Sequence, residues 1–264
     1  MNGAMLTLLS PAKDLAEGPF PKVAKTTLPK LLEHSEPLIK KLRGCSTKRL
    51  AGLMGISPKL AELNHTRFQD WSTPFTLKNA TPAVFLFNGE AYRGLDARTL
   101  DAADLQFAQH HLRILSGLYG VLRPLDLIQP YRLEMGTTLP VARKKNLYAY
   151  WGDRISMALK AELATGPNVV VNLASSEYFK AVRSNMLGVR IVTPVFKDRT
   201  ASGYKVVMVH AKHQRGSMAR YIMQNRILDP EKLKAYDADG YRYSKADSSA
   251  DEFVFLRAHF PQVR

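Results

Sequence analysis

Apolar residues gather in short runs whose length is typical of buried strands. Such runs lie at residues 5–9, 83–87 and 168–173, and each is followed by polar or turn-forming residues. Apolar positions three and four residues apart predict helices over residues 101–112 and 146–164. The pattern therefore predicts strands and helices that are interspersed along the chain.

The C-terminal third continues this mixture of elements. Residues 189–196 and 204–209 predict two strands joined by a polar turn, a basic helix is predicted over residues 217–228, and a last strand over residues 253–257. Because the elements do not follow a strict strand–helix–strand order, we expect a mixed α/β (α+β) fold with helices flanking a mixed sheet. The 264 residues are compatible with one compact domain over residues 1–264.

A glycine-containing corner between two short helices is predicted within residues 46–70. The first helix ends at Gly55, and the second begins after the capping residue Ser57, with Lys59 in its first turn. The backbone N–H groups of Ser57, Lys59 and Leu60 would then be free to bind a phosphate oxygen. The pattern is similar to a helix-hairpin-helix, although Ser57 stands where the second glycine of Gly-x-Gly is usual. An ordinary helical corner fits the same residues.

Polar residues directly follow two of the predicted strands. Ser10 and Lys13 follow the first strand, and Ser175 and Glu177 follow the strand at residues 168–173. Hydroxyl groups at such a position hold an anion or cap the following helix. Because strand-end loops gather ligand-binding groups in sheets with parallel strands, we expect one cleft here, with Lys180 close to it. The expected cleft residues are Ser10, Lys13, Arg132, Asn172, Ser175 and Glu177.

Basic residues outnumber acidic ones, with 38 Lys and Arg against 23 Asp and Glu, for a formal net charge of +15. The excess is concentrated in residues 22–49 and 174–226. Concentrated positive charge indicates a polyanionic partner such as DNA, and a basic face that only keeps the protein soluble is the simpler alternative. The residues expected to contact DNA are Gly55, Ser57, Lys59, Lys180, Arg183, Arg215 and Arg220.

The sequence argues against a membrane protein and against a metal site. No run reaches the roughly 18 apolar residues of a spanning helix, and the first apolar run is too short for a signal peptide, so we expect a cytoplasmic protein. Cys45 is the only cysteine, which excludes an internal disulfide and a thiolate metal cluster. His210 and His213 have no third ligand at a suitable spacing. We therefore expect no metal site and no cofactor.

Four segments together resemble the YaaA family of peroxide stress proteins. They are Ser10-Pro11-Ala12-Lys13, residues 110–136 (HHLRILSGLYGVLRPLDLIQPYRLEMG), Tyr150-Trp151-Gly152-Asp153 and residues 172–180 (NLASSEYFK). The likeness extends from residue 5 to about residue 257. It implies a bacterial cytoplasmic protein, linked to hydrogen peroxide stress and to keeping free iron low, that has a mixed α/β fold, a helix-hairpin-helix and a positive cleft and binds DNA. It assigns no reaction.

Two functions remain open. In the first, the protein binds duplex or distorted DNA and protects it against oxidative damage. In the second, it is an enzyme whose cleft holds a nucleotide-like or phosphorylated ligand, with Lys13 or Glu177 as acid or base. A pocket of small-molecule size at the strand ends favours the enzyme, and an open basic groove favours DNA.

Overall fold

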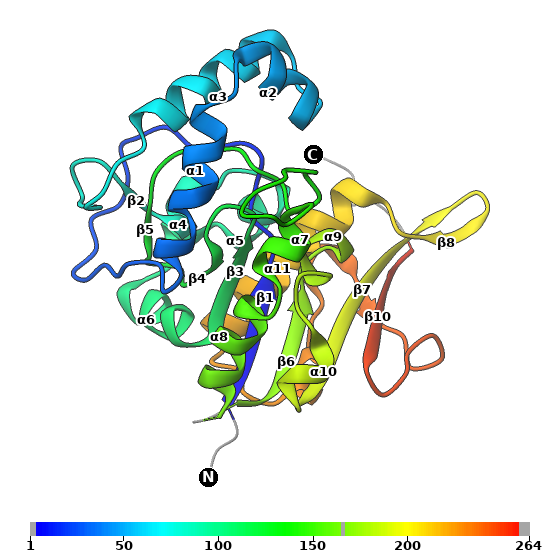
Figure 1. Cartoon of the computed structure of the whole chain (residues 1–264). Helices are drawn as coiled ribbons and strands as arrows, with labels where there is room; N and C mark the ends of the chain where they lie inside the picture. Colours follow the sequence, from blue (N-terminus) through cyan, green and yellow to red (C-terminus); the bar gives the residue numbers. More distant parts are fainter. Residues whose placement is uncertain (1–3, 165–166, 259–264) are drawn as a thin grey trace.

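A mixed sheet forms the centre of the molecule (Figure 1). In the computed structural model, which describes residues 4–164 and 167–258, eight strands pair in the order β4-β3-β1-β6-β7-β10-β9, with β8 on β7. The strands β3, β1, β6, β7 and β10 run parallel, whereas β4, β8 and β9 pair antiparallel at the margins. This arrangement confirms the mixed α/β fold.

The sheet strands are β1 (Ala4–Leu9), β3 (Leu112–Ser116), β4 (Gly120–Leu122), β6 (Pro167–Leu173), β7 (Arg190–Thr200), β8 (Gly203–Lys205), β9 (Arg242–Tyr243) and β10 (Glu252–Arg257). A separate two-stranded sheet pairs β2 (Thr81–Pro82) with β5 (Leu127–Ile128). The helices are α1 (Glu36–Arg43), α2 (Thr47–Met54), α3 (Pro58–Asp70), α4 (Ala83–Leu86), α5 (Glu90–Leu95), α6 (Ala102–His111), α7 (Leu147–Trp151), α8 (Arg154–Leu163), α9 (Ser176–Phe179), α10 (Ser184–Leu187) and α11 (Met208–Gln224).

Helices cover both faces of the sheet. The helices α6 and α11 pack against β1 and against each other, and α8 contacts β4 and β6. Figure 1 shows α8 and α10 in front of the strands and α11 behind them, while α1, α2 and α3 form a group at the top. Within the described residues, no helix has both the length and the apolar character needed to cross a membrane.

Four predicted elements differ from the structure. The helix predicted over residues 217–228 is α11, which begins earlier, at Met208, and ends at Gln224. The apolar run at residues 83–87 begins with the short buried helix α4, because a short apolar run suits a buried helix as well as a strand. The helix predicted over residues 146–164 is divided into α7 and α8 at Gly152, where φ is 50° and ψ is −118°. The strand predicted at residues 204–209 is shorter, since β8 ends at Lys205 and α11 already begins at Met208.

The order of the strands creates a crevice at one end of β1. The chain places β3 on one side of β1 and later returns to place β6 on the other side. The register aligns Leu9 with Leu173, so these two parallel strands end together. In open sheets with parallel strands, ligands bind at the carboxyl ends of two adjacent strands whose following connections run to opposite sides of the sheet. Here β1 is followed in the sheet by β3 on one side, and β6 is followed by β7 on the other. The loops that begin at Ser10 and Ala174 therefore lie at the position where a site is expected.

The helices α5 and α11 cross in close contact through two glycines. A Cβ atom on Gly216 would lie 1.7 Å from the carbonyl oxygen of Ala91, and one on Gly94 would lie 2.2 Å from that of His213. Such separations are far below van der Waals contact, so only glycine permits this crossing. The contact holds the first half of α11 beside the start of α5, close to the end of β1.

We expect Gly216→Ala to lower the free energy of unfolding by about 3 kcal/mol or more, because the new methyl group must force the two backbones apart. Gly52→Ala is the matched control. Gly52 lies inside α2 with no atom in the way of a Cβ, so the same change there should stabilise the protein by roughly 0.5 to 1 kcal/mol. Urea denaturation of both variants measures the difference, and similar effects of the two changes would contradict the close crossing.

Candidate functional site

A pocket of about 460 Å³ opens where β1 and β6 end side by side, and we call it the strand-end pocket. The backbone N–H of Ser175 donates to Ser10 Oγ at 2.9 Å, and Ser10 Oγ donates to Ser175 Oγ at 3.3 Å. The Tyr92 hydroxyl donates to the carbonyl oxygen of Ser10 at 3.1 Å. Although Ser175 precedes α9, its hydroxyl makes no capping bond within the described structure. The two serines thus join the strand ends.

A carboxylate between two cations lies beside the strand-end pocket, and one of the two cations, Lys13, lines it. Glu134 lies 2.6 Å from Lys13 Nζ and 3.2 Å from Arg132 Nη2. The side chains of Arg132 and Glu134 are largely buried, whereas that of Lys13 is 56% exposed. The buried Nε of Arg132 has no hydrogen-bond partner among the described residues. Lys13 is therefore directed toward Glu134, which lines the linking hollow described below and not the strand-end pocket.

Glu177 connects the pocket with a neighbouring loop. Its Oε1 accepts a hydrogen bond from the backbone N–H of Gly136 at 2.8 Å, and its carbonyl oxygen accepts one from the Tyr148 hydroxyl at 2.9 Å. Glu177 also lines a second hollow of about 620 Å³, together with Gly136 and residues 52–54 of α2. We call this the linking hollow, because it lies between α2 and the strand-end pocket.

The helix α11 contributes two cations to the strand-end pocket. Lys212 is exposed, and Arg215 is half-buried. Neither side chain has an ion pair or a hydrogen bond with any residue in the described part of the chain. Burial lowers the pKa of the Arg215 guanidinium, which nevertheless stays charged at neutral pH. Tyr92 and Tyr178 form part of the wall, and burial raises the pKa of both phenols, so they remain protonated.

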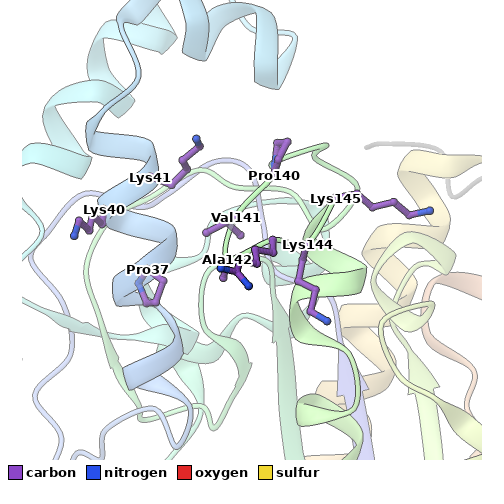
Figure 2. A pocket seen from close by; sticks show the side chains of 9 residues that line it. Pro37, Lys40, Lys41, Pro140, Val141, Ala142, Lys144 and Lys145 are labelled. Carbon is purple, nitrogen blue, oxygen red and sulfur yellow. The ribbon is translucent and has the colours of Figure 1, made fainter.

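A basic groove of about 780 Å³ lies between α1 and the loop that precedes α7 (Figure 2). Lys40 and Lys41 come from α1, and Arg143, Lys144 and Lys145 come from the loop. None of these five side chains has an ion pair or a hydrogen bond within residues 4–164 and 167–258. Figure 2 shows the labelled lysines on both sides of the groove, with their ammonium groups directed outward. The groove is open and carries five positive charges that no described residue compensates.

The loop side of the basic groove is a tight turn with unusual backbone angles. Val141 and Lys144 exchange two backbone hydrogen bonds, and the two residues between them, Ala142 and Arg143, have φ values of 47° and 59°. Non-glycine residues rarely adopt this left-handed conformation, and it is often found at functional sites. The turn presents three consecutive basic residues at the edge of the groove.

The corner between α2 and α3 has the local geometry that the sequence predicts. Gly55 adopts the left-handed conformation, with φ 60° and ψ 44°, and ends α2. Ser57 caps α3, and its hydroxyl accepts a hydrogen bond from the Leu60 N–H at 3.3 Å, so this N–H is not free as expected. Lys59 is exposed in the first turn of α3. A short corner of this kind does not by itself establish a helix-hairpin-helix.

Comparison with known proteins identifies the family. The family described as "Peroxide stress protein YaaA" matches residues 5–247. The UPF0246 protein of Ralstonia nicotianae is 54% identical over 254 residues, covering 96% of this chain and 99% of that protein. The UPF0246 protein of Neisseria meningitidis serogroup B is 49% identical over 255 residues, covering 96% of this chain and 98% of that protein.

The chain belongs to the YaaA family of peroxide stress proteins. The resemblance recognised in the sequence is thereby confirmed, and the relatives are bacterial proteins.

Of the six cleft residues expected in this YaaA family member, four line the strand-end pocket and two do not. Ser10, Lys13, Ser175 and Glu177 line the strand-end pocket. Arg132 is not part of the lining, and it is linked to the lining residue Lys13 through Glu134. Asn172 is not part of the lining in the described structure. It is buried in β6, where its Oδ1 accepts a hydrogen bond from the Ala174 N–H at 3.0 Å and shapes the strand end.

The residues expected to contact DNA are also divided. Lys180 lies outside the described lining of the pocket, with its ammonium group 5.2 Å from the centre of the Tyr148 ring. Arg183 is paired with Asp153 at 2.6 Å. Arg220 donates to the carbonyl oxygens of Leu95 and Asp96, at 3.1 and 2.8 Å, and so closes the end of α5. Of the expected residues on the 174–226 segment, only Arg215 lines a pocket without a partner in the described structure.

The basic residues of the groove that follow residue 140 were not among the residues predicted to bind DNA. Their signal was the run Arg143-Lys144-Lys145, which is short and lies outside the two segments with the largest charge excess. Their position opposite α1 depends on the tertiary fold.

We expect Glu134→Gln to lower the free energy of unfolding by about 1 to 3 kcal/mol, because it leaves the largely buried Arg132 without a counter-charge. Lys13→Gln should cost less than about 1 kcal/mol, since Lys13 is more than half exposed and Glu134 keeps Arg132 as a partner. Urea denaturation of both variants at neutral pH tests this order. A larger loss with Lys13→Gln would show that the assignment of the buried pair is wrong.

Proposed function

We propose that this YaaA family member binds DNA through the basic groove and the α2–α3 corner. The observation that carries the proposal is the set of five cations on the two sides of the groove, which have no partner among the described residues. Positive charge without local partners attracts the phosphate backbone and gains free energy by releasing its counterions. Paired arginines, such as Arg183, contribute less to such an attraction because their charge is already compensated.

The corner supports the proposal from a neighbouring part of the surface. The helix α1, which forms one side of the groove, leads through Gly44 to Ser46 directly into α2. The exposed Lys59 side chain and the free N–H of the first turn of α3 would contact a second stretch of backbone, as in a helix-hairpin-helix. Such contacts position a protein on DNA without reading its sequence.

Membership of a peroxide stress family supports a protective role for this binding. We propose that the protein shields or marks DNA that is exposed to oxidative damage. The described residues include no group of three or more His, Cys, Asp and Glu side chains that could hold a metal ion. For the effect on free iron that the family resemblance implies, we propose an indirect route.

The basic groove is tested by the double change Lys144→Glu with Lys145→Glu. We expect the affinity for any duplex to fall about tenfold or more at moderate salt, since both changes repel phosphate. The log–log slope of affinity against salt should become less steep by about 0.9 for each phosphate that the variant no longer neutralises. Fluorescence anisotropy with duplexes of unrelated sequence measures both effects.

The control is Lys78→Glu with Lys232→Glu, which reverses the same charge at two exposed positions outside the groove and the corner. Loss of affinity with the control but not with the groove variant would contradict the proposed surface.

The corner is tested by Lys59→Glu. We expect similar losses of affinity on all duplexes, because the contact is to the backbone and carries no base information. Lys59→Arg should retain wild-type affinity, since it keeps the positive charge. Both variants should unfold like the wild type, because the Lys59 side chain is exposed. Wild-type affinity of Lys59→Glu at low salt would remove the corner from the proposed interface.

A further inference from the structure

Neither the basic groove nor the α2–α3 corner accounts for Arg215. A guanidinium that is withdrawn from water is costly when no carboxylate compensates it, and the usual outcome is an ion pair. Arg226 and Arg183 belong, like Arg215, to the basic segment of residues 174–226. They form such ion pairs with Asp104 and Asp153, respectively. Arg215 has none among the described residues and lines the strand-end pocket instead. Its charge is therefore available to a ligand.

The planar guanidinium suits one type of ligand group in particular. Its donors form a fork that matches two oxygens of a phosphate or a carboxylate. Lys212 lies one turn of α11 before Arg215 and lines the same pocket, so a second positive charge is at hand. Two positive charges match a phosphate, which carries one to two negative charges at neutral pH, better than a single carboxylate.

The rest of the strand-end pocket is too large and too varied for inorganic phosphate alone. Its volume of about 460 Å³ is within the range of sites for small organic ligands. Pro11, Tyr92, Tyr178 and Met208 provide apolar and aromatic surface. The Ser176 hydroxyl and the carboxylate of Glu177, of which only Oε1 is engaged in the described structure, can bond to polar ring or sugar groups. The pocket therefore offers one region for an anion and another for a flat polar ring.

The pocket also lies next to the proposed DNA surface. Glu177 lines both the strand-end pocket and the linking hollow, and residues 52–54 of α2 form the opposite side of that hollow. A nucleotide that leaves the stack of a DNA molecule held at the corner would meet this hollow first. Proteins that act on single bases take the nucleotide out of the stack into a pocket of this kind.

We propose that the strand-end pocket binds one unpaired nucleotide, with its phosphate group at Arg215 and Lys212 and its base against the aromatic side of the pocket. The nucleotide comes either from locally unpaired DNA or from free solution, and both sources present the same chemistry. The choice of a nucleotide rests in part on the proposed DNA binding, because the linking hollow joins the two sites.

The fluorescent base 2-aminopurine serves as the probe for both sources. The first probe is the free 5′-monophosphate of 2-aminopurine deoxyriboside, compared with its nucleoside, which lacks the phosphate. The second is a DNA duplex with one unpaired 2-aminopurine in an internal loop, compared with a fully paired duplex. Anisotropy and emission of the base report its binding, and a labelled strand reports the affinity for each duplex.

We expect at least one of the two probes to bind with a change in 2-aminopurine emission. For that probe, Arg215→Gln should weaken binding about tenfold, the effect of losing a charge-assisted hydrogen bond, whereas Arg215→Lys should recover part of the loss. Lys212→Gln should weaken it about threefold. Lys232→Gln, which removes an exposed charge outside the pocket, should change nothing. If Arg215→Gln does not fold, as judged by circular dichroism, the exposed Lys212 decides by the same criterion.

Two results would overturn the pocket proposal. One is that the Arg215→Gln and Lys212→Gln variants bind both probes with the same affinity as the wild type. The other is an equal loss of affinity for the paired and the looped duplex, which would make Arg215 part of the general DNA surface. Failure of the proposed DNA binding is recognised separately, because the paired duplex would then not be bound while the free monophosphate could still depend on Arg215.

Discussion

The parallel pairing of β1 with β6 is the interaction on which the site depends. The two strands are separated by more than half of the chain, yet their register brings Leu9 beside Leu173 and lets Ser10 bond to Ser175. Burial of both apolar strands stabilises this pairing, since the side chains of Leu9 and Leu173 are almost completely removed from water. Because the two strands end together, Ser10 and Ser175, which directly follow the strands, are placed next to each other. Core packing and site geometry are thus consequences of the same contact.

A second constraint, the close crossing of α5 and α11, places α11 beside the paired strands β1 and β6. The crossing at Gly94 and Gly216 allows backbone to approach backbone, and it holds the first half of α11 over the end of β1. Arg215 immediately precedes Gly216, so the glycine that permits the contact also sets the place of the guanidinium. A larger residue at position 216 would separate the helices and move the positive charge away from the strand-end pocket.

The sequence predicted those parts of the site that follow from strand order. Ser10 and Ser175 could be joined because parallel strands that are neighbours end at the same edge. Asn172, which was expected in the cleft, lies outside the lining of the strand-end pocket. Its side-chain oxygen accepts a hydrogen bond from the Ala174 N–H, a local bond that no pattern of apolar residues indicates. The sequence also did not indicate that Arg183 forms an ion pair and that Arg220 bonds to backbone carbonyl oxygens. Their partners, Asp153 and the end of α5, come from distant segments, and counting charges does not separate paired from unpaired cations.

The unpaired cations lie in two different environments, the basic groove and the strand-end pocket. In the basic groove, cations such as Lys40 and Lys145 are exposed on the two sides of an open channel, which suits many weak contacts with a long polyanion. In the strand-end pocket, Arg215 is half-buried, and a partly desolvated charge interacts more strongly with one well-placed partner than an exposed charge does. In the DNA binding proposed above, the groove supplies an affinity that depends on salt and not on base sequence. The proposed role of the pocket is to select a single unpaired nucleotide. Glu177 lines both the pocket and the linking hollow, and so lies between the two proposed binding sites.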